Sequence, residues 1–171
     1  MEEKVSTARV ALKYGVLASV VIMIYTTIIN VTGLSQNKIL SSLSFAFMII
    51  AIVLAMKDFR EQNKGFLSYG EGLGVGTLVS AIMGLLSSAF AMFYMQFIDD
   101  TLLTQGMNKV REDMERKGMD DAQIDQAMEL SQKFMSPGVV FAFGVFGYII
   151  MGLIISLIVA AILRREKPVF E

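Results

Sequence analysis

The stretch from residue 73 to residue 98, LGVGTLVSAIMGLLSSAFAMFYMQFI, decides the fold. It contains no Asp, Glu, Lys or Arg, and the carboxylates of Asp99 and Asp100 follow it directly. An α-helix rises roughly 1.5 Å per residue and the hydrocarbon core of a bilayer is about 30 Å thick, so about 20 apolar residues are enough to cross it. The stretch is therefore long enough to form a transmembrane helix.

Three other stretches meet the same test. They cover residues 14–31, 39–56 and 138–163, and charged residues lie outside each of them. Strands of a membrane β-barrel would be about ten residues long with alternating apolar and polar side chains, which is not the pattern of these stretches. The sequence predicts an all-α fold, a bundle of four transmembrane helices that forms a single membrane domain over residues 1–171.

The composition supports the same class and excludes several functions. Hydrophobic residues make up 54% of the chain and charged residues 18%, and the mean hydropathy is +0.59. Basic and acidic residues number 15 and 16, so the chain has no basic excess for binding nucleic acid. Cys and His are both absent, which removes thiol nucleophiles, imidazole bases and the usual ligands of zinc, haem and iron–sulfur clusters. We expect no cofactor, no metal site and no enzymatic activity.

The basic residues near the ends of the four stretches predict the orientation. The first stretch follows an acidic Met1-Glu2-Glu3 start, is longer than the apolar core of a signal peptide and precedes no A-x-A site, so we expect it to be retained. Basic residues gather on one side of the membrane, at Lys4, Arg9, Lys13, Lys57, Arg60, Lys64, Arg164, Arg165 and Lys167. The positive-inside rule then places both termini in the cytoplasm.

Residues 99–135, between the third and fourth stretches, predict two short amphipathic helices. Apolar residues recur at helical spacing, as Leu103, Met107, Val110 and Met114 in the first and as Ile124, Ala127, Met128 and Met135 in the second. A hairpin of fewer than about 40 residues does not normally fold alone. We expect it to lie outside the cytoplasm and to rest on the membrane surface or on the bundle.

Local signals mark the boundaries of this hairpin. Asp99 or Asp100 can cap the first helix, and Gly118 is suited to the turn. Asp120 can cap the second helix, with Gln123 three residues later completing a capping box. We interpret these carboxylates as helix caps and not as a pair for acid–base catalysis.

Small residues recur at every fourth position of the third stretch and predict a helix-packing ridge. The ridge consists of Gly72, Gly76, Ser80, Gly84 and Ser88, and the fourth stretch carries a similar series at Gly152, Ser156 and Ala160. Small residues let the backbones of two transmembrane helices approach closely. The two series can pack on one another within a chain or across a dimer, and the sequence does not choose between these alternatives.

Residues that could support transport or metal binding have simpler interpretations. No stretch contains a charged residue at its centre, which is where ion-coupling residues are usually found. Glu71 comes closest, but it lies at the start of the third stretch beside Phe66 and Tyr69, so we expect an interfacial position. The chain has 13 Met residues, and thioethers can bind copper(I). Without Cys or His nearby, adaptable packing is the preferred interpretation.

The order of several short segments resembles a known family. These segments are GFLSYGEG at 65–72, KGM at 117–119, QAM at 126–128, FMSP at 134–137 and the apolar run 155–163 before the basic tail. Together they resemble the bacterial domain-of-unknown-function family 4199, found chiefly in Bacteroidota, over nearly the whole chain. The resemblance implies a four-helix inner-membrane protein of a family without an assigned activity, and it supplies no catalytic residue.

Two functional hypotheses follow. The first is a non-enzymatic membrane scaffold or accessory subunit, because the ridges and the hairpin offer surfaces to a second copy of the chain or to another membrane protein. The second is a small channel or transporter. It would have to be oligomeric, because four helices alone rarely enclose a polar pore. The lipid bilayer is the one partner that the sequence predicts directly.

Overall fold

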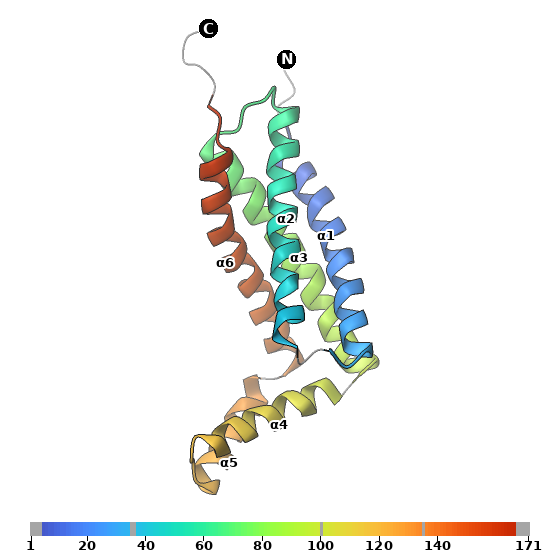
Figure 1. The fold of residues 1–171 in the computed structure, drawn as a ribbon, viewed down its shortest axis with the longest axis vertical. Coiled ribbons are helices and arrows are strands. Elements are labelled where there is room, and N and C mark those ends of the chain that lie inside the picture. The colour runs from blue at the N-terminus through green and yellow to red at the C-terminus, as the bar shows by residue number, and fades with distance from the viewer. Residues whose placement is uncertain (1–4, 35–36, 100, 135, 167–171) are drawn as a thin grey trace. The chain divides into compact units, whose positions relative to one another are not determined.

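The computed structural model describes residues 5–34, 37–99, 101–134 and 136–166. Within these ranges the chain forms six α-helices (Figure 1), which are α1 (Thr7–Val31), α2 (Lys38–Gln62), α3 (Tyr69–Phe97), α4 (Thr101–Arg116), α5 (Asp121–Phe134) and α6 (Pro137–Leu163). α1, α2, α3 and α6 are each long and apolar enough to cross a membrane. The predicted all-α fold with four membrane-spanning helices and two shorter helices between the third and fourth is confirmed.

All four long helices begin or end beyond the apolar stretches that predicted them, α6 by a single residue. α1 begins at Thr7 because the hydroxyl of Ser6 accepts a hydrogen bond from the backbone N–H of Arg9, at 3.3 Å. α2 continues past Met56 to Gln62, through six residues of which four are charged. An apolar run measures the part of a helix that lies in hydrocarbon, whereas the helix itself continues into water wherever its residues permit.

The chain divides into two compact units. The first contains residues 1–87 and 145–171, and the second contains residues 88–144. In the first unit α1 and α2 are antiparallel, since the hydroxyl of Tyr25 near the end of α1 donates to the carbonyl oxygen of Leu40 near the start of α2, at 2.8 Å. Their opposite ends are joined by Lys13 and Asp58. α1 and α3 are parallel, because Gly15 lies against Ile82 and Thr7 lies near Gly74.

The core of the first unit is apolar and draws on all four long helices and the α2–α3 loop. Its largest fully buried side chains are Met48, Ile52, Met56, Phe59, Leu67, Val75, Val79 and Met83. Many large apolar side chains on the outer faces are exposed instead, for example Leu17 at 58%, Ile24 at 58% and Ile158 at 60%. Such an outer surface suits contact with lipid, because apolar patches of this extent are rare on soluble monomers.

One end of this unit is closed by the α2–α3 loop and the residues that follow α6. Lys64 and Gly65 turn the chain with positive φ angles of 57° and 85°. Leu67, which is fully buried, then exchanges two backbone hydrogen bonds of 2.8 Å with Arg165. The guanidinium of Arg60 also donates to the carbonyl oxygen of Leu163, at 3.4 Å. We call this arrangement the clasp, and it fixes the end of α6 to the start of α3.

The second unit contains the predicted hairpin. α3 ends at Phe97, and a carboxylate oxygen of Asp99 accepts the backbone N–H of Thr101 at 3.0 Å, which caps α4. Gly118 has the positive φ angle, 74°, that the turn requires. Asp120 accepts the backbone N–H of Gln123 at 2.8 Å, as the sequence predicts for the start of α5. Asp100, the alternative cap, lies outside the described residues.

Most of the predicted apolar faces of the hairpin are covered within it. α4 and α5 pack against each other. Ile124 is 1% exposed. Five further members of the two faces are half-buried, namely Met107, Val110, Met114, Ala127 and Met128. The side chain of Leu103 and the whole of Met135 lie outside the described part of the chain.

Candidate functional site

The small residues singled out by the sequence form a continuous contact between α3 and α6, here called the seam. The two helices are antiparallel, and every step of four residues along α3 is matched by a step of four back along α6. Three facing pairs consist of the predicted ridge residues alone, and they are Gly72 with Ala160, Gly76 with Ser156 and Ser80 with Gly152. The structure thus places these six residues against one another within one chain.

The two remaining ridge residues continue the same register with larger or unpredicted partners. In the first unit Gly84 faces Tyr148, and in the second unit Ser88 faces Gly144. A Cβ atom built on Gly84 would lie 2.7 Å from the Cβ of Tyr148 and 3.1 Å from the carbonyl oxygen of Val145. A glycine is therefore needed here because the neighbouring helix, and not only a flexible side chain, occupies the space.

The seam has no room for additional atoms. A Cβ on Gly72 would lie 2.9 Å from the Cβ of Ala160, closer than real Cβ contacts, and one on Gly152 would overlap the hydroxyl of Ser80. A Cβ on Gly76 would overlap the hydroxyl of Ser156. By contrast, Gly147 on the same α6 helix has no neighbour within 4 Å of such an atom. The close approach is specific to the residues at the four-residue spacing.

The serine hydroxyls in and near the seam differ in their partners. Ser80 donates to the carbonyl oxygen of Gly76 one turn earlier, at 2.9 Å, and Ser19 of α1 does the same to Gly15 at 2.6 Å. Ser156 is fully buried, and its hydroxyl has no hydrogen-bond partner among the described residues. Every buried polar side chain in the described part of the chain belongs to a serine. The buried hydroxyl oxygens of Thr77 and Ser87 likewise have no partner among the described residues. The hydroxyls of Ser80 and Ser19, which bond to their own helices, serve packing.

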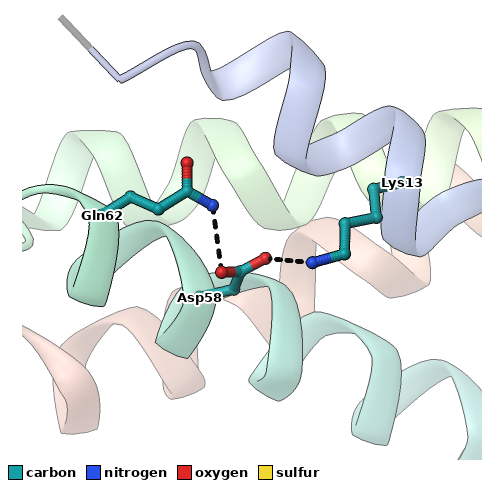
Figure 2. Close-up of polar contacts among 3 residues, drawn as sticks. All are labelled: Lys13, Asp58 and Gln62. Carbon is teal, nitrogen blue, oxygen red and sulfur yellow. Dashed lines mark hydrogen bonds and ion pairs between the residues drawn. The ribbon is translucent and has the colours of Figure 1, made fainter.

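A second polar feature joins α1 and α2 and was not predicted. Figure 2 shows the carboxylate of Asp58 between the side chains of Lys13 and Gln62. The Lys13 ammonium lies 2.8 Å from one oxygen of Asp58, and the Gln62 amide donates to the other at 3.0 Å. The ammonium also lies 4.9 Å from the ring centre of Tyr14, within the range of a cation–π contact.

This cluster holds the ends of α1 and α2 together. The Lys13 side chain is 56% exposed and that of Asp58 18% exposed, so water screens the ion pair strongly. The sequence indicates the Lys13–Asp58 contact only through the positions of the two charges, which lie at the polar ends of the consecutive antiparallel helices α1 and α2. The basic residues at these ends predict the orientation of the helices in the membrane, but no local pattern could show that Lys13 meets Asp58.

Glu71, which the sequence analysis weighed as an ion-coupling residue, has a structural role. Its carboxylate accepts hydrogen bonds from the backbone N–H and the hydroxyl of Ser68, at 2.9 and 2.8 Å, and the Ser68 hydroxyl accepts the backbone N–H of Glu71 at 3.3 Å. This is a capping box, whose Ser-x-x-Glu pattern is legible in the sequence. It explains why α3 begins at Tyr69, earlier than the apolar stretch indicated.

The described residues contain no group of three or more His, Cys, Asp or Glu side chains that could hold a metal ion. Their organisation is that of a helical membrane protein, in which four apolar helices pack through small residues and the charged side chains lie at the helix ends.

Within this class the chain belongs to the family described as proteins of unknown function, DUF4199, whose sequence pattern matches residues 13–165. No curated protein and no solved structure matches the chain. The match covers all four long helices except the first turns of α1, together with the hairpin and the clasp. The resemblance noted in the sequence is confirmed as family membership.

Proposed function

We propose that this protein is a non-enzymatic membrane scaffold or accessory subunit that holds a partner through its extramembrane hairpin. The observation that carries the proposal is the seam, because α3 and α6 approach until the hydroxyl of Ser80 occupies the space beside Gly152. A bundle interior closed by such contacts suits a rigid support. Partner recognition then falls to the parts of the chain outside the four spans.

The hairpin has features that suit binding to another protein. Leu130 and Phe134 lie one turn apart on α5 and are 56% and 55% exposed, although both are large and apolar. Lys133 and Glu129, which precede them by one residue each, form an exposed ion pair of 3.2 Å. An exposed apolar pair with a charged margin is typical of a protein interface. The partner that fits it is a second copy of the chain or another membrane protein.

The setting of the proposal is the inner membrane of a bacterium, with both termini in the cytoplasm and the hairpin on the opposite side. The basic residues of the first unit support this orientation. Lys13, Lys57, Arg60, Arg164 and Arg165 all belong to the helix ends that the clasp and the Lys13–Asp58 pair bring to one end of the unit. Such an excess is the usual mark of the cytoplasmic side.

A site-specific crosslinking experiment tests the scaffold function. A photoreactive amino acid is placed at Leu130 or Phe134 in cells, with Asp113, an exposed residue of α4, as the matched control position. We expect a defined crosslinked species from the two α5 positions, either a dimer or a complex with one membrane protein, and none from Asp113. Failure to recover any such species from both α5 positions would refute the proposal.

Flux measurements separate this function from that of a channel or transporter. Purified protein in proteoliposomes is expected to leave the permeability to ions and small solutes at the level of protein-free vesicles. A flux that rises with the amount of protein and is lost in a variant with a disrupted seam would favour the channel instead.

A further inference from the structure

A groove lies between α1 and α3 on the outer face of the first unit. Its volume is about 380 Å³, and it is lined by Ala8, Arg9, Ala11 and Leu12 of α1 and by Leu78 and Ile82 of α3. Apart from Arg9, every lining residue is apolar. Leu12 and Leu78 are 58% and 42% exposed, so the groove opens toward the surroundings of the two membrane-spanning helices and not toward the core.

The sequence explains why the groove exists. α1 and α3 touch at Gly15, where a Cβ atom would lie 2.8 Å from the Cβ of Ile82, and they approach again where Thr7 lies 3.9 Å from such an atom on Gly74. Between these two points α1 presents the exposed Ala8, whose methyl group cannot fill the space between parallel helices, while Ala11 is fully buried at the base of the groove. The groove is therefore bounded at both ends by contacts of the same two helices.

The shape of the groove selects the kind of occupant. A helix from another protein has a diameter of about 10 Å with its side chains, and it cannot enter between two helices that are already in contact at Gly15. A single hydrocarbon chain has no such difficulty. The distance along α1 from Arg9 to Gly15 is roughly 9 Å at 1.5 Å per residue, which accommodates the part of an acyl chain nearest its headgroup.

Arg9 gives the groove a polar limit. It is exposed and lies in the first turn of α1, three residues after the capping Ser6, so it marks the end of the span where headgroups begin. A guanidinium binds phosphate oxygens through paired N–H groups. The same end of the unit carries Arg60, Arg165 and Arg164, the last of which pairs with Glu166 at 3.9 Å. Basic residues near the membrane surface attract anionic lipids.

We propose that this groove is a binding site for an anionic phospholipid, with one acyl chain against Ala8, Leu12 and Leu78 and the phosphate on Arg9. The proposal is independent of the scaffold function, because it rests on the contacts of α1 with α3 and on the membrane spans alone. The composition already predicts a lipid bilayer as a partner, and this proposal assigns one specific lipid to one site on the protein.

The test uses native mass spectrometry of the full chain in detergent, titrated with phosphatidylglycerol or phosphatidylcholine of identical acyl chains. Arg9→Gln removes the charge and leaves the groove, whereas Ala8→Phe fills the groove and leaves the charge. Matched controls are Arg111→Gln on α4 and Ala161→Phe at an exposed position of α6. Glycerol phosphate, which has the anionic headgroup chemistry without acyl chains, serves as competitor.

We expect the wild type to retain phosphatidylglycerol about fivefold more tightly than phosphatidylcholine, the effect of one basic residue near a phosphate. Arg9→Gln should remove this preference, Ala8→Phe should weaken the binding of both lipids, and both controls should behave as the wild type. Glycerol phosphate should not displace the lipid. Equal retention of the two lipids by the wild type, or unchanged binding in Ala8→Phe, would overturn the proposal. A dimer that Ala8→Phe abolishes would assign the groove to a second copy of the chain.

Discussion

At the scale of single residues, Ser156 and Ser80 show how similar side chains in one contact can differ energetically. Both are fully buried between α3 and α6. The Ser80 hydroxyl donates to the carbonyl oxygen of Gly76, whereas that of Ser156 has no partner in the described part of the chain. A buried hydroxyl without a hydrogen bond costs about 1–3 kcal/mol of desolvation, and a methyl group in its place does not carry this cost.

The first prediction follows from this difference. Ser156→Ala should leave the free energy of unfolding unchanged or raise it by up to about 1 kcal/mol, because the lost hydroxyl contributed no bond. The Gly76 backbone keeps its close neighbour, since the Cβ of residue 156 remains. The measurement is reversible unfolding of the full chain in mixed micelles. A loss of stability larger than that of Ser80→Ala would show that the Ser156 hydroxyl has a bonding partner.

Single residues could be assigned from the sequence where their role depends on neighbours in the chain, and not where it depends on distant residues. Gly118, Asp120 and Gln123 could be assigned from their spacing because caps and turns depend on local chemistry. Ser68 and Glu71 carry an equally local signal that was read as an interfacial position. The Lys13–Asp58 contact joins residues far apart in the chain, so it depends on the register of two helices that no local pattern determines.

At the scale of elements, the seam depends on a match between two helices. The spacing of small residues in α3 and α6 can be read in the sequence, and it favours close packing. Which residue of α3 faces which residue of α6 is a property of the pair, and the alternative of packing across a dimer was equally compatible with the pattern. Tyr148 shows the limit, because a large residue faces Gly84 inside a series of small ones.

A matched pair of glycines on α6 tests the seam. Gly152→Ala should lower the free energy of unfolding by about 1–3 kcal/mol, because the added Cβ overlaps Ser80 and the two helices must separate. Gly147→Ala adds the same atom in open space and should be neutral or stabilising by up to about 1 kcal/mol, the difference in helix propensity. Thermal denaturation of both variants in one detergent gives the comparison. Equal effects at the two positions would remove the seam as the reason for the glycines.

The hairpin is an element whose own packing changes how its docking must be tested. Since Ile124 is already buried within the hairpin, low water accessibility there does not report on contact with the bundle or the membrane. Met107 belongs to the predicted apolar face, is only half-buried within the hairpin and is the better probe, with the exposed Glu115 of α4 as its control.

Docking of the hairpin stays a prediction. Spin labels in lipid should show low water accessibility at Met107 and high accessibility at Glu115, because covering an apolar side chain such as that of Met107 stabilises the docked state by about 1.5–3 kcal/mol. The measurement is power saturation with a water-soluble relaxation agent. High accessibility at both positions would mean that the hairpin projects into water.

At the scale of the whole molecule, the four-span organisation follows from composition and run length, and these properties do not depend on tertiary contacts. The clasp could not be predicted in the same way. Leu67 comes just before α3 and Arg165 just after α6, so the two residues are far apart in the chain. They are joined by backbone hydrogen bonds, which leave no pattern in the side chains. Only the arrangement of α3 and α6 brings these two backbone segments together.

The orientation of the molecule can be measured directly. Alkaline phosphatase, which is active only outside the cytoplasm, is fused after Glu171 or inserted at Gly118 in the turn between α4 and α5. We expect activity from the Gly118 insertion and none from the C-terminal fusion, because the basic helix ends remain on the cytoplasmic side. A cytoplasmic reporter such as green fluorescent protein should give the opposite result, and a reversed pattern with both reporters would invert the topology.

The antiparallel register of the seam has a consequence during synthesis. The small-residue face of α3 is complete once Ser88 has been made, but its partners on α6 follow only after the whole of α4 and α5. At the usual rate of about 5 to 20 residues per second, translation of that interval takes several seconds. Throughout this time the nascent chain carries in the bilayer a face made for another helix. Because α3 is synthesised before α6, there is a period in which membrane insertases or chaperones can bind α3 before α6 covers it.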